Sequence, residues 1–243
     1  MFEISSEMLG MEYGAIYTEN STTFRLWSPT SQSVSLQLYK DGNYGDAYEI
    51  HTMDRLDSGI WEVEVNGDLD GIYYTYRIGS GNCHHEVVDI NAKAVGANGM
   101  RGMVVNMNDT NPLGWEDQNR IKLDHYTDAI IYEVHVRDFS IDESGNFNFR
   151  GKFLAFTETG RTNTQGDSVG LDSLIELGIT HVHLLPSYDF ESIDELNLEK
   201  PAFNWGYDPQ NYNAPEGSYS TNARDGHIRI KELKLLIKTL HDH

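Results

Sequence analysis

Residues 129–136 of the chain read Ala-Ile-Ile-Tyr-Glu-Val-His-Val, and residues 178–186 read Gly-Ile-Thr-His-Val-His-Leu-Leu-Pro. Both are nearly continuous apolar runs, which are typical of strands buried on both faces in a parallel sheet. The residues between them, 170–178, place apolar side chains at helical spacing and end on Gly178, a residue type that commonly terminates helices. The sequence therefore predicts a strand, a helix and a second, parallel strand.

A further amphipathic helix is predicted at the end of the chain. Residues 225–243 carry an apolar stripe at helical spacing, which consists of Ile230, Leu233, Leu236, Ile237 and Leu240. A strand–helix–strand unit followed by another helix begins either a doubly wound sheet or a (β/α)8 barrel. Because a complete barrel takes about 250 residues, we expect only its first part in the 117 residues of 127–243.

The N-terminal part of the chain has a different pattern. Residues 14–105 contain short segments in which apolar and polar residues alternate, as in 22–27 (TTFRLW). Turn residues separate these segments at a spacing of about ten, which predicts an antiparallel β-sandwich of about seven strands. We therefore expect a multidomain β plus α/β chain, with a sandwich in residues 1–112, a linker in 113–126 and the α/β region in 127–243.

The overall charge limits the classes of partner. The chain has 243 residues, with 18 Lys and Arg against 38 Asp and Glu, and a formal net charge of −20. Such a charge repels nucleic acids and anionic lipid surfaces, so neither is expected as a partner, whereas neutral sugars are suitable ligands. No apolar run is long enough to span a membrane and the first residues lack targeting features, so we expect a soluble, cytoplasmic protein. The single cysteine, Cys83, excludes an internal disulfide and is expected to be a half-buried thiol in a reducing compartment.

Hydrolysis of glycosidic bonds fits neutral substrates and an acidic protein, and it commonly uses two carboxylates. Asp138, Asp189 and Glu191 follow the predicted parallel strands, where barrels build their active sites. We expect Asp138 instead to pair with the neighbouring Arg137 and fix the strand end, because buried charges are normally paired. The acidic run 189–199 is expected to form a solvated loop face.

Histidine pairs are the candidate metal ligands. His181 and His183 share one face of a predicted strand, and His84 and His85 follow Cys83. No third ligand has a recognisable spacing, so we predict no metal site. The sequence has neither a glycine-rich phosphate loop nor a Gly-x-Ser-x-Gly elbow, so nucleotide and acyl chemistry are excluded and no cofactor is expected.

The most unusual segment is residues 203–209, Phe-Asn-Trp-Gly-Tyr-Asp-Pro. Loops that follow barrel strands line the substrate cleft, and an aromatic ring can stack on the apolar face of a glucose ring. Tyr207 is the candidate for this contact because Gly206 and Asp208 flank it. Phe203 and Trp205 are expected to pack the loop onto the rest of the domain.

Three of these segments resemble the start of a type I pullulanase, an α-1,6-glucan debranching enzyme of glycoside hydrolase family 13. They are residues 132–140 (YEVHVRDFS), 178–186 (GITHVHLLP) and 203–209 (FNWGYDP). The last is the most specific, and it differs from the usual family string only by Phe203 in place of tyrosine. Upstream, residues 24–29, 71–76 and 89–102 resemble the family 48 carbohydrate-binding module that precedes the barrel in such enzymes.

The resemblance implies a retaining glycosidase that acts on pullulan, limit dextrin or glycogen-type branches. It implies that Tyr207 stacks on the glucose unit next to the scissile bond, that Asp208 lines that subsite, and that Asn204 and Trp205 hold the loop. The family's catalytic carboxylates are expected beyond His243, so we expect the 243-residue chain alone to be inactive. The unpaired edges of an incomplete barrel are expected to promote self-association.

Two other functions stay open at this point. The chain fits a non-catalytic α-glucan-binding or scaffold protein, and it fits another family 13 enzyme, such as an isoamylase or a branching enzyme. In the module, Trp27 and Trp61 lie on alternating strands, and we expect both to belong to the sandwich core rather than to a sugar platform.

Overall fold

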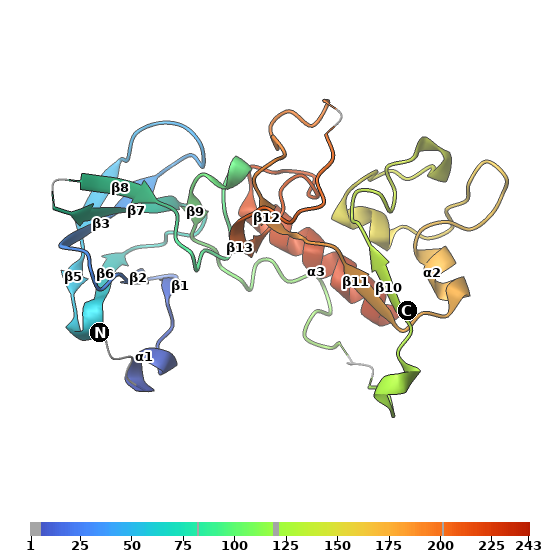
Figure 1. Cartoon of the computed structure of the whole chain (residues 1–243), viewed down its shortest axis with the longest axis horizontal. Coiled ribbons are helices and arrows are strands. Elements are labelled where there is room, and N and C mark those ends of the chain that lie inside the picture. The colour runs from blue at the N-terminus through green and yellow to red at the C-terminus, as the bar shows by residue number, and fades with distance from the viewer. Residues whose placement is uncertain (1–5, 82, 119–121, 201) are drawn as a thin grey trace. The chain divides into compact units, whose positions relative to one another are not determined.

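The computed structural model describes residues 6–81, 83–118, 122–200 and 202–243 (Figure 1). The chain divides into two compact units. The first comprises Met1–Asn106, Asn211–Ala214 and Arg224–Gly226, and the second comprises Met107–Gln210, Pro215–Ala223 and His227–His243.

The domain boundaries expected from the sequence, 1–112, 113–126 and 127–243, stay a prediction. Residues 119–121 of the expected linker, and residues 1–5, where a targeting segment was sought, lie outside the described residues.

The first unit is built around two antiparallel sheets. One has the strand order β1-β2-β6-β5, formed by β1 (Gly14–Tyr17), β2 (Ser21–Trp27), β6 (Ile60–Asn66) and β5 (Asp54–Arg55). The other has the order β4-β3-β7-β8, with β9 paired to β7, and is formed by β4 (Glu49–Thr52), β3 (Ser33–Tyr39), β7 (Tyr73–Ser80), β8 (Cys83–Val87) and β9 (Gly102–Met103). Figure 1 shows them as two layers. The predicted sandwich is confirmed. It has more strands than the seven expected from the sequence, and these include β5 and β9, which at two residues each are too short to show an alternation of apolar and polar residues.

The alternation in β2 decides which residues form the core of the sandwich. Phe24 and Leu26 are buried in the cluster between the sheets, as is Trp61 of β6. The same alternation turns Trp27 outward, where it is 42% exposed and its Nε1 donates a hydrogen bond to the Ser58 carbonyl at 3.1 Å. The prediction of a core position is therefore right for Trp61 and wrong for Trp27.

One buried carboxylate ties the sandwich to the segment that follows β8. Asp89 accepts hydrogen bonds from the hydroxyls of Tyr74 at 2.8 Å and Tyr76 at 3.3 Å, and from the backbone N–H of Asn91 at 2.9 Å. Burial raises the pKa of Asp89, although these hydrogen bonds oppose the rise. The Phe24 ring meets Tyr74 edge-on, with the ring centroids 5.0 Å apart.

Segments from late in the chain complete the first unit. Ala214 joins Ala92 and Val95 in a small buried cluster. The side-chain amide of Asn211 donates to the Gly99 carbonyl at 3.2 Å, and that of Asn213 donates to the Ile90 carbonyl at 2.9 Å. The module is therefore discontinuous in sequence.

Cys83 lies at the start of β8, an edge strand, and is exposed. The expectation of a half-buried thiol is wrong, because within the part of the chain that the structure describes β8 pairs with β7 alone.

The second unit contains the predicted strand–helix–strand. Strands β10 (Ile131–Val134) and β11 (His181–Leu184) pair in parallel, with Ile131 opposite His181. Helix α2 (Leu171–Leu177) lies between them in sequence and ends at Gly178, which adopts a φ of 66°. In L residues this conformation is strained, so glycine is the natural cap.

Burial of this strand pair differs from the expectation. Ile131 is 65% exposed and Tyr132 is 40% exposed. Among the described residues, β10 pairs with β11 alone and β11 with β10 alone, so the pair is not enclosed in a wider sheet. The apolar runs were therefore correctly identified as parallel strands and wrongly predicted to be buried on both faces.

Helix α3 (Gly226–Asp242) packs its apolar stripe into the core of the second unit. Leu236 is fully buried there with Val136, Phe153 and Tyr219. The connection between β11 and α3, expected to be a loop, contains two strands, β12 (Tyr188–Phe190) and β13 (Pro209–Pro215), which form a two-stranded sheet.

The remaining helical elements are short. They are α1 (Ser6–Gly10) and the 3-10 turns Asp57–Gly59, Ala97–Gly99, Tyr126–Asp128, Glu143–Gly145 and Phe153–Thr157. Within the described ranges, no helix combines the length and apolar composition that crossing a bilayer would require.

The Asp89 cluster yields a stability prediction. Tyr74→Phe removes the shorter hydrogen bond and leaves a buried carboxylate with one donor fewer, which we expect to cost about 1–3 kcal/mol. Tyr76→Phe removes the longer bond and is expected to cost less. Urea unfolding of both variants measures the difference. Equal losses of unfolding free energy in the two variants would contradict the prediction that the Tyr74 hydroxyl contributes more than the Tyr76 hydroxyl.

Candidate functional site

The loop 203–209 precedes β13 and is held by its own polar side chains. The side-chain amide of Asn204 donates to Asp208 Oδ1 at 2.6 Å, and the N–H of Gly206 donates to Asn204 Oδ1 at 2.9 Å. Gly206 has a φ of 86°, and a Cβ at this position would lie 2.9 Å from the Cβ of Pro186. Glycine is required both for the backbone conformation and for the close approach to Pro186.

Asp208 joins this loop to the segment that follows β12. Its Oδ2 accepts hydrogen bonds from the backbone N–H of Ser192 at 3.0 Å and from the Ser192 hydroxyl. Partial burial alone would raise the pKa of Asp208, but the hydrogen bonds from Ser192 and Asn204 outweigh burial and hold the pKa below its usual value. The carboxylate is thus kept ionised and oriented.

His135, one residue past β10, contacts the same loop. It is only 6% exposed. Its Nε2 lies 2.9 Å from the carbonyl oxygen of Asn204 and 3.2 Å from the hydroxyl of Tyr219. Its Nδ1 accepts the backbone N–H of Asp138 at 3.3 Å. His135 was not among the residues predicted for the site, because in the sequence it is one position of an apolar run, residues 129–136.

The aromatic residues of the loop divide into two kinds. The ring centroids of Phe203 and Trp205 lie 5.1 Å and 6.4 Å from that of His135, and 5.4 Å from each other. Both keep about half of their surface exposed, while Tyr207 is 68% exposed. Phe203 and Trp205 thus contact the His135 ring while about half of each stays exposed, and Tyr207 is presented to solvent from a backbone held by hydrogen bonds.

A cleft of about 750 Å³ lies beside His135 and Asn204. Its wall includes Tyr219 and Phe190, and the ammonium-bearing side chain of Lys152 also lines it. Lys152 Nζ donates to the Ser218 carbonyl at 2.7 Å, and burial lowers the pKa of this amine despite nearby carboxylates. The cleft combines aromatic rings with hydrogen-bond donors, as small-ligand sites commonly do.

The carboxylates suggested by sequence position take structural roles. Asp138 Oδ1 lies 3.1 Å from Arg137 Nη1, as the expected strand-end pair requires. Glu191 is exposed, whereas Asp189 and Glu195 are 0% and 4% exposed. The prediction that 189–199 forms a solvated loop face is therefore wrong for the two residues that pair with a buried cation.

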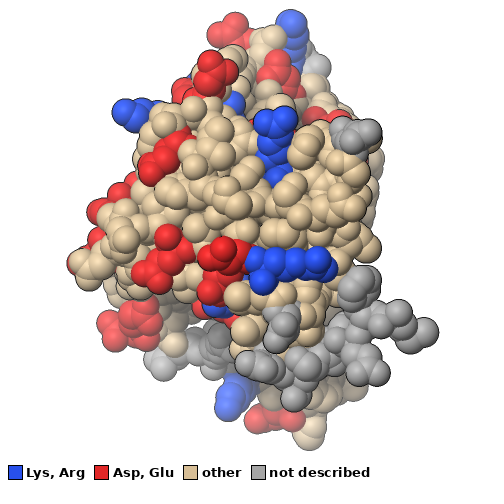
Figure 2. Space-filling view, turned by 90° about the vertical axis from the view of Figure 1, so that its left-hand side faces the viewer, with Lys and Arg blue, Asp and Glu red and all other residues tan. Residues whose placement is uncertain are grey.

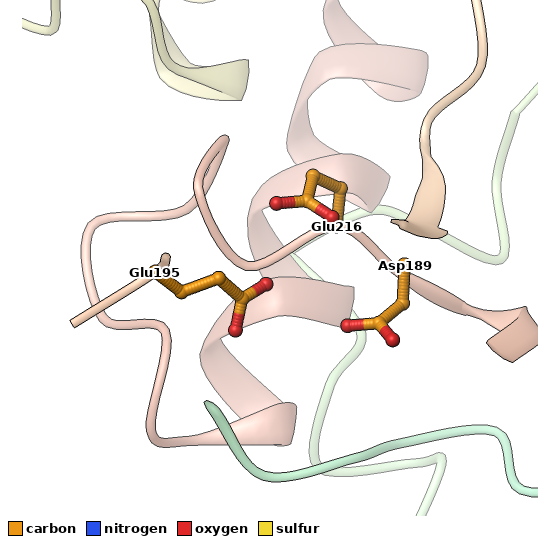
Figure 3. Close-up of side chains that lie close together, drawn as sticks. All are labelled: Asp189, Glu195 and Glu216. Atoms are coloured by element: carbon orange, nitrogen blue, oxygen red, sulfur yellow. The ribbon is translucent and has the colours of Figure 1, made fainter. Parts of the chain in front are cut away.

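That cation is Arg229 of α3. Asp189, Glu195 and Glu216 place carboxylate oxygens within 4.8 Å of one another, and Figure 3 shows the three side chains converging. Arg229 Nη1 lies 3.0 Å from Asp189 Oδ1, and Nη2 lies 2.6 Å from Glu195 Oε2. The guanidinium thus supplies the positive charge that a cluster of buried carboxylates requires, so the cluster has a structural explanation without a metal ion.

Glu216 is the third carboxylate of the buried cluster. It accepts hydrogen bonds from the backbone N–H groups of Phe190 at 3.0 Å and Ser218 at 2.9 Å. Burial, reinforced by the neighbouring Glu195 carboxylate, raises the pKa of Glu216 to about 8. One carboxyl group of the cluster therefore binds a proton more tightly than it would in water.

The strand histidines are engaged with near neighbours. His183 Nδ1 lies 3.4 Å from Glu133 Oε2, and His181 Nδ1 lies 2.8 Å from the Thr180 hydroxyl. Within the described residues, the group of three candidate ligands close enough to share an ion is Asp189, Glu195 and Glu216, where Arg229 already sits.

The buried cation gives the next prediction. Arg229→Met leaves buried carboxylates without their positive partner, and we expect the free energy of unfolding to fall by about 3–5 kcal/mol in urea titrations. Lys238→Met, on the same helix but in a more exposed pair with Asp242, is the matched control and should cost about 0.3–0.5 kcal/mol. If Arg229→Met does not fold, Arg229→Lys, which retains the charge without the fork, should show an intermediate loss. A loss below 1 kcal/mol for Arg229→Met would contradict this role.

Glu216 predicts a pH dependence. Because its pKa rises from the ordinary 4.5 to about 8 on folding, the stabilisation from its bound proton is fully present below pH 4.5 and is lost as the pH rises through 8. The free energy of unfolding, measured in urea, should therefore fall between pH 5 and 8.5, by ~1.4 kcal/mol for each pH unit in which only the folded state keeps the proton. Glu216→Gln should flatten this dependence, whereas the exposed Glu143→Gln should not. If the free energy of unfolding depended on pH in the same way in Glu216→Gln and in the parent chain, Glu216 would not be the group responsible.

Comparison with known proteins accounts for both units. The family model for carbohydrate-binding module 48, the isoamylase N-terminal domain, matches residues 9–92. The chain is 43% identical over 234 residues to the pullulanase of Bacillus subtilis (strain 168), covering 96% of this chain and 31% of that protein. It is 31% identical to pullulanase 1 (chloroplastic) of Arabidopsis thaliana, covering 94% of this chain and 27% of that protein.

Comparison with solved structures also gives pullulanases as similar proteins. A crystal structure of the pullulanase from Paenibacillus barengoltzii in complex with maltohexaose and α-cyclodextrin matches with a TM-score of 0.94 and 46% identity, covering 96% of this chain and 36% of that one. The chain thus spans about a third of the length of the pullulanases it matches. The resemblance inferred from residues 203–209 and the upstream motifs is confirmed: the chain is similar to part of known pullulanases over nearly its whole length, and its residues 9–92 match carbohydrate-binding module 48.

Proposed function

We propose that the chain forms part of a retaining debranching enzyme that hydrolyses α-1,6-glucosidic linkages in pullulan, limit dextrin or glycogen-type branches. The observation that carries the proposal is the presentation of Tyr207, 68% exposed on a loop fixed by Asn204, Asp208 and Ser192. The similarity to pullulanases over 96% of the chain supports the choice of substrate class.

In this proposal, β10, α2, β11 and α3 are the first part of a (β/α)8 barrel. The parallel pairing of β10 with β11 across an intervening helix supports it. Barrel enzymes build their active sites from the segments that follow the carboxyl ends of the strands. His135 follows β10, and the loop 203–209 belongs to the connection after β11, so both come from such segments.

Tyr207 would stack on the C–H face of a glucose unit, and Asp208 would line the same subsite. Both oxygens of Asp208 already accept hydrogen bonds, from Asn204 and from Ser192, so its main contribution would be to hold Tyr207 at a fixed angle. A loop that is already held in place loses less conformational entropy on binding a neutral sugar than a loose one. Figure 2 views the side of the chain that the first unit occupies in Figure 1, where an uncharged area lies between scattered charges, so this face of the family 48 module would not repel a neutral polymer.

The hydrolytic step requires two carboxylates, about 5 to 5.5 Å apart in retaining enzymes. Asp189, Glu195 and Glu216 come close to one another but are buried and committed to Arg229 or to backbone groups. They are therefore unsuited to attack an anomeric carbon. We assign the nucleophile and the acid to positions beyond His243, as the family resemblance implies, and propose that residues 1–243 alone do not hydrolyse glucan.

A glucan-binding function without hydrolysis is the second candidate. The family 48 module over residues 9–92 supports it. Self-association belongs to the same proposal, since Ile130, Ile131 and Tyr132 expose apolar surface beside the edge of the parallel pair. Sedimentation velocity over a range of concentrations tests this association.

The proposal predicts that Tyr207→Ala weakens maltohexaose binding to the 243-residue chain by about tenfold, because the loss of an aromatic contact worth ~1.4 kcal/mol changes an equilibrium constant by that factor. Titration calorimetry measures the affinity. Tyr212→Ala is the matched control, since Tyr212 is also 68% exposed but lies on β13, and it should bind like the parent chain. Equal affinity of Tyr207→Ala and the parent chain would argue against the contact.

The release of reducing ends from pullulan separates the two candidate functions. A polypeptide that extends past His243 through the expected carboxylates should cleave pullulan if the chain belongs to a debranching enzyme. Maltohexaose binding without any cleavage by the extended polypeptide would favour the non-catalytic glucan binder.

A further inference from the structure

We propose that His135 is the positioning residue of the proposed glucan site, in that it fixes the loop carrying Tyr207 to the end of strand β10. This inference rests on the proposed function for its ligand, but the geometry of the loop can be tested independently. His135 is the residue at which the backbone after β10, the loop 203–209 and Tyr219 meet.

The hydrogen bonds define the tautomer of His135. The backbone N–H of Asp138 points at Nδ1 at 3.3 Å, and because an N–H can only donate, Nδ1 must be the acceptor. In a neutral ring the proton then resides on Nε2, which lies 2.9 Å from the carbonyl oxygen of Asn204. A donor on one side of the ring and an acceptor on the other fix its orientation.

Asn204 transmits this orientation to Tyr207. Its carbonyl is bound by His135, while its side-chain oxygen accepts the N–H of Gly206 and its side-chain amide donates to Asp208. Gly206 and Asp208 are the two neighbours of Tyr207 in sequence. The path from β10 to Tyr207 is therefore a continuous set of hydrogen bonds, all with donor–acceptor distances between 2.6 and 2.9 Å.

Ring packing alone does not account for a histidine at this position. Phe203, Trp205 and Tyr219 surround the ring at centroid distances of 5.1 to 6.4 Å, and a phenylalanine would satisfy these contacts. Phenylalanine would leave the Asn204 carbonyl and the Asp138 N–H without their partner at position 135. Both nitrogens of His135 are used, and each joins a different segment of backbone.

The experiment compares His135→Phe and His135→Gln in the full 243-residue chain. We expect His135→Phe to accelerate hydrogen exchange of the Gly206 amide at least tenfold, while the Leu185 amide, which is bonded to the Val134 carbonyl, keeps its rate. Glutamine can donate from its side-chain amide to Asn204, so His135→Gln should restore most of the protection. His183→Phe, on the exposed face of β11, is the matched control and should leave the Gly206 rate unchanged.

Two further measurements decide the inference. Nitrogen-15 spectra of the parent chain should show an unprotonated Nδ1 in His135, and this holds as a test even if the variants do not fold. His135→Phe should weaken maltohexaose binding about as much as Tyr207→Ala does, and His135→Gln should recover it. Any one of three results would overturn the proposal. The first is a proton on Nδ1 of His135, and the second is an unchanged exchange rate of the Gly206 amide in His135→Phe. The third is an exchange rate in His135→Gln as fast as that in His135→Phe. If the parent chain does not bind maltohexaose, the glucan site itself fails, while the exchange and nitrogen-15 results still decide whether His135 positions the loop.

Discussion

The second unit depends on one buried guanidinium. Nη1 of Arg229 donates to Asp189 and to the Pro215 carbonyl, and Nη2 donates to Glu195. Both Nε and Nη2 also donate to the Ala223 carbonyl. The planar fork of arginine can serve so many acceptors at fixed angles, which the compact ammonium of lysine cannot. Helix α3, strand β12 and the turns before the helix are thereby joined at one point.

The loop 203–209 is attached to this joined region. Phe190 of β12 donates its backbone N–H to Glu216 and lines the cleft, and Ser192, two residues later, holds Asp208. The position of the loop 203–209 is thus determined from two directions, by Ser192 on one side and by His135 on the other. The buried cluster and the loop 203–209 are therefore both bonded to the same short segment, residues 190–192.

Local patterns in the sequence were sufficient to predict helices and strands, but they were insufficient to predict which polar side chains are buried. The end of α2 at Gly178 follows from the conformation of one residue and was predicted. The alternation in β2 was predicted too, but Trp27 was placed on its inward face, which the period of two assigns to Phe24 and Leu26. The exposure of Tyr207 also followed from its flanking residues.

The burial of Asp189 depends on Arg229, forty residues further along the chain, and no local pattern reveals such a pair. One signal was available: Arg229 falls on the apolar stripe of α3, in register with Leu233, Leu236 and Leu240, where a charge requires a buried partner. His135 gave no comparable signal, because its ring nitrogens are bound by the Asn204 carbonyl, the Asp138 N–H and the Tyr219 hydroxyl, which no local pattern connects to it.

The discontinuity of the first unit has a consequence for the order of synthesis. Strands β1 to β9 are complete once residue 103 has left the ribosome, yet Ala214 covers Ala92 and Val95, and the side chains of Asn211 and Asn213 occupy the carbonyls of Gly99 and Ile90. The nascent module therefore exists for more than a hundred codons with these groups uncovered. A gene cut after codon 106 would preserve that immature form, so any domain dissection of this protein has to carry residues 211–214 along with the sandwich.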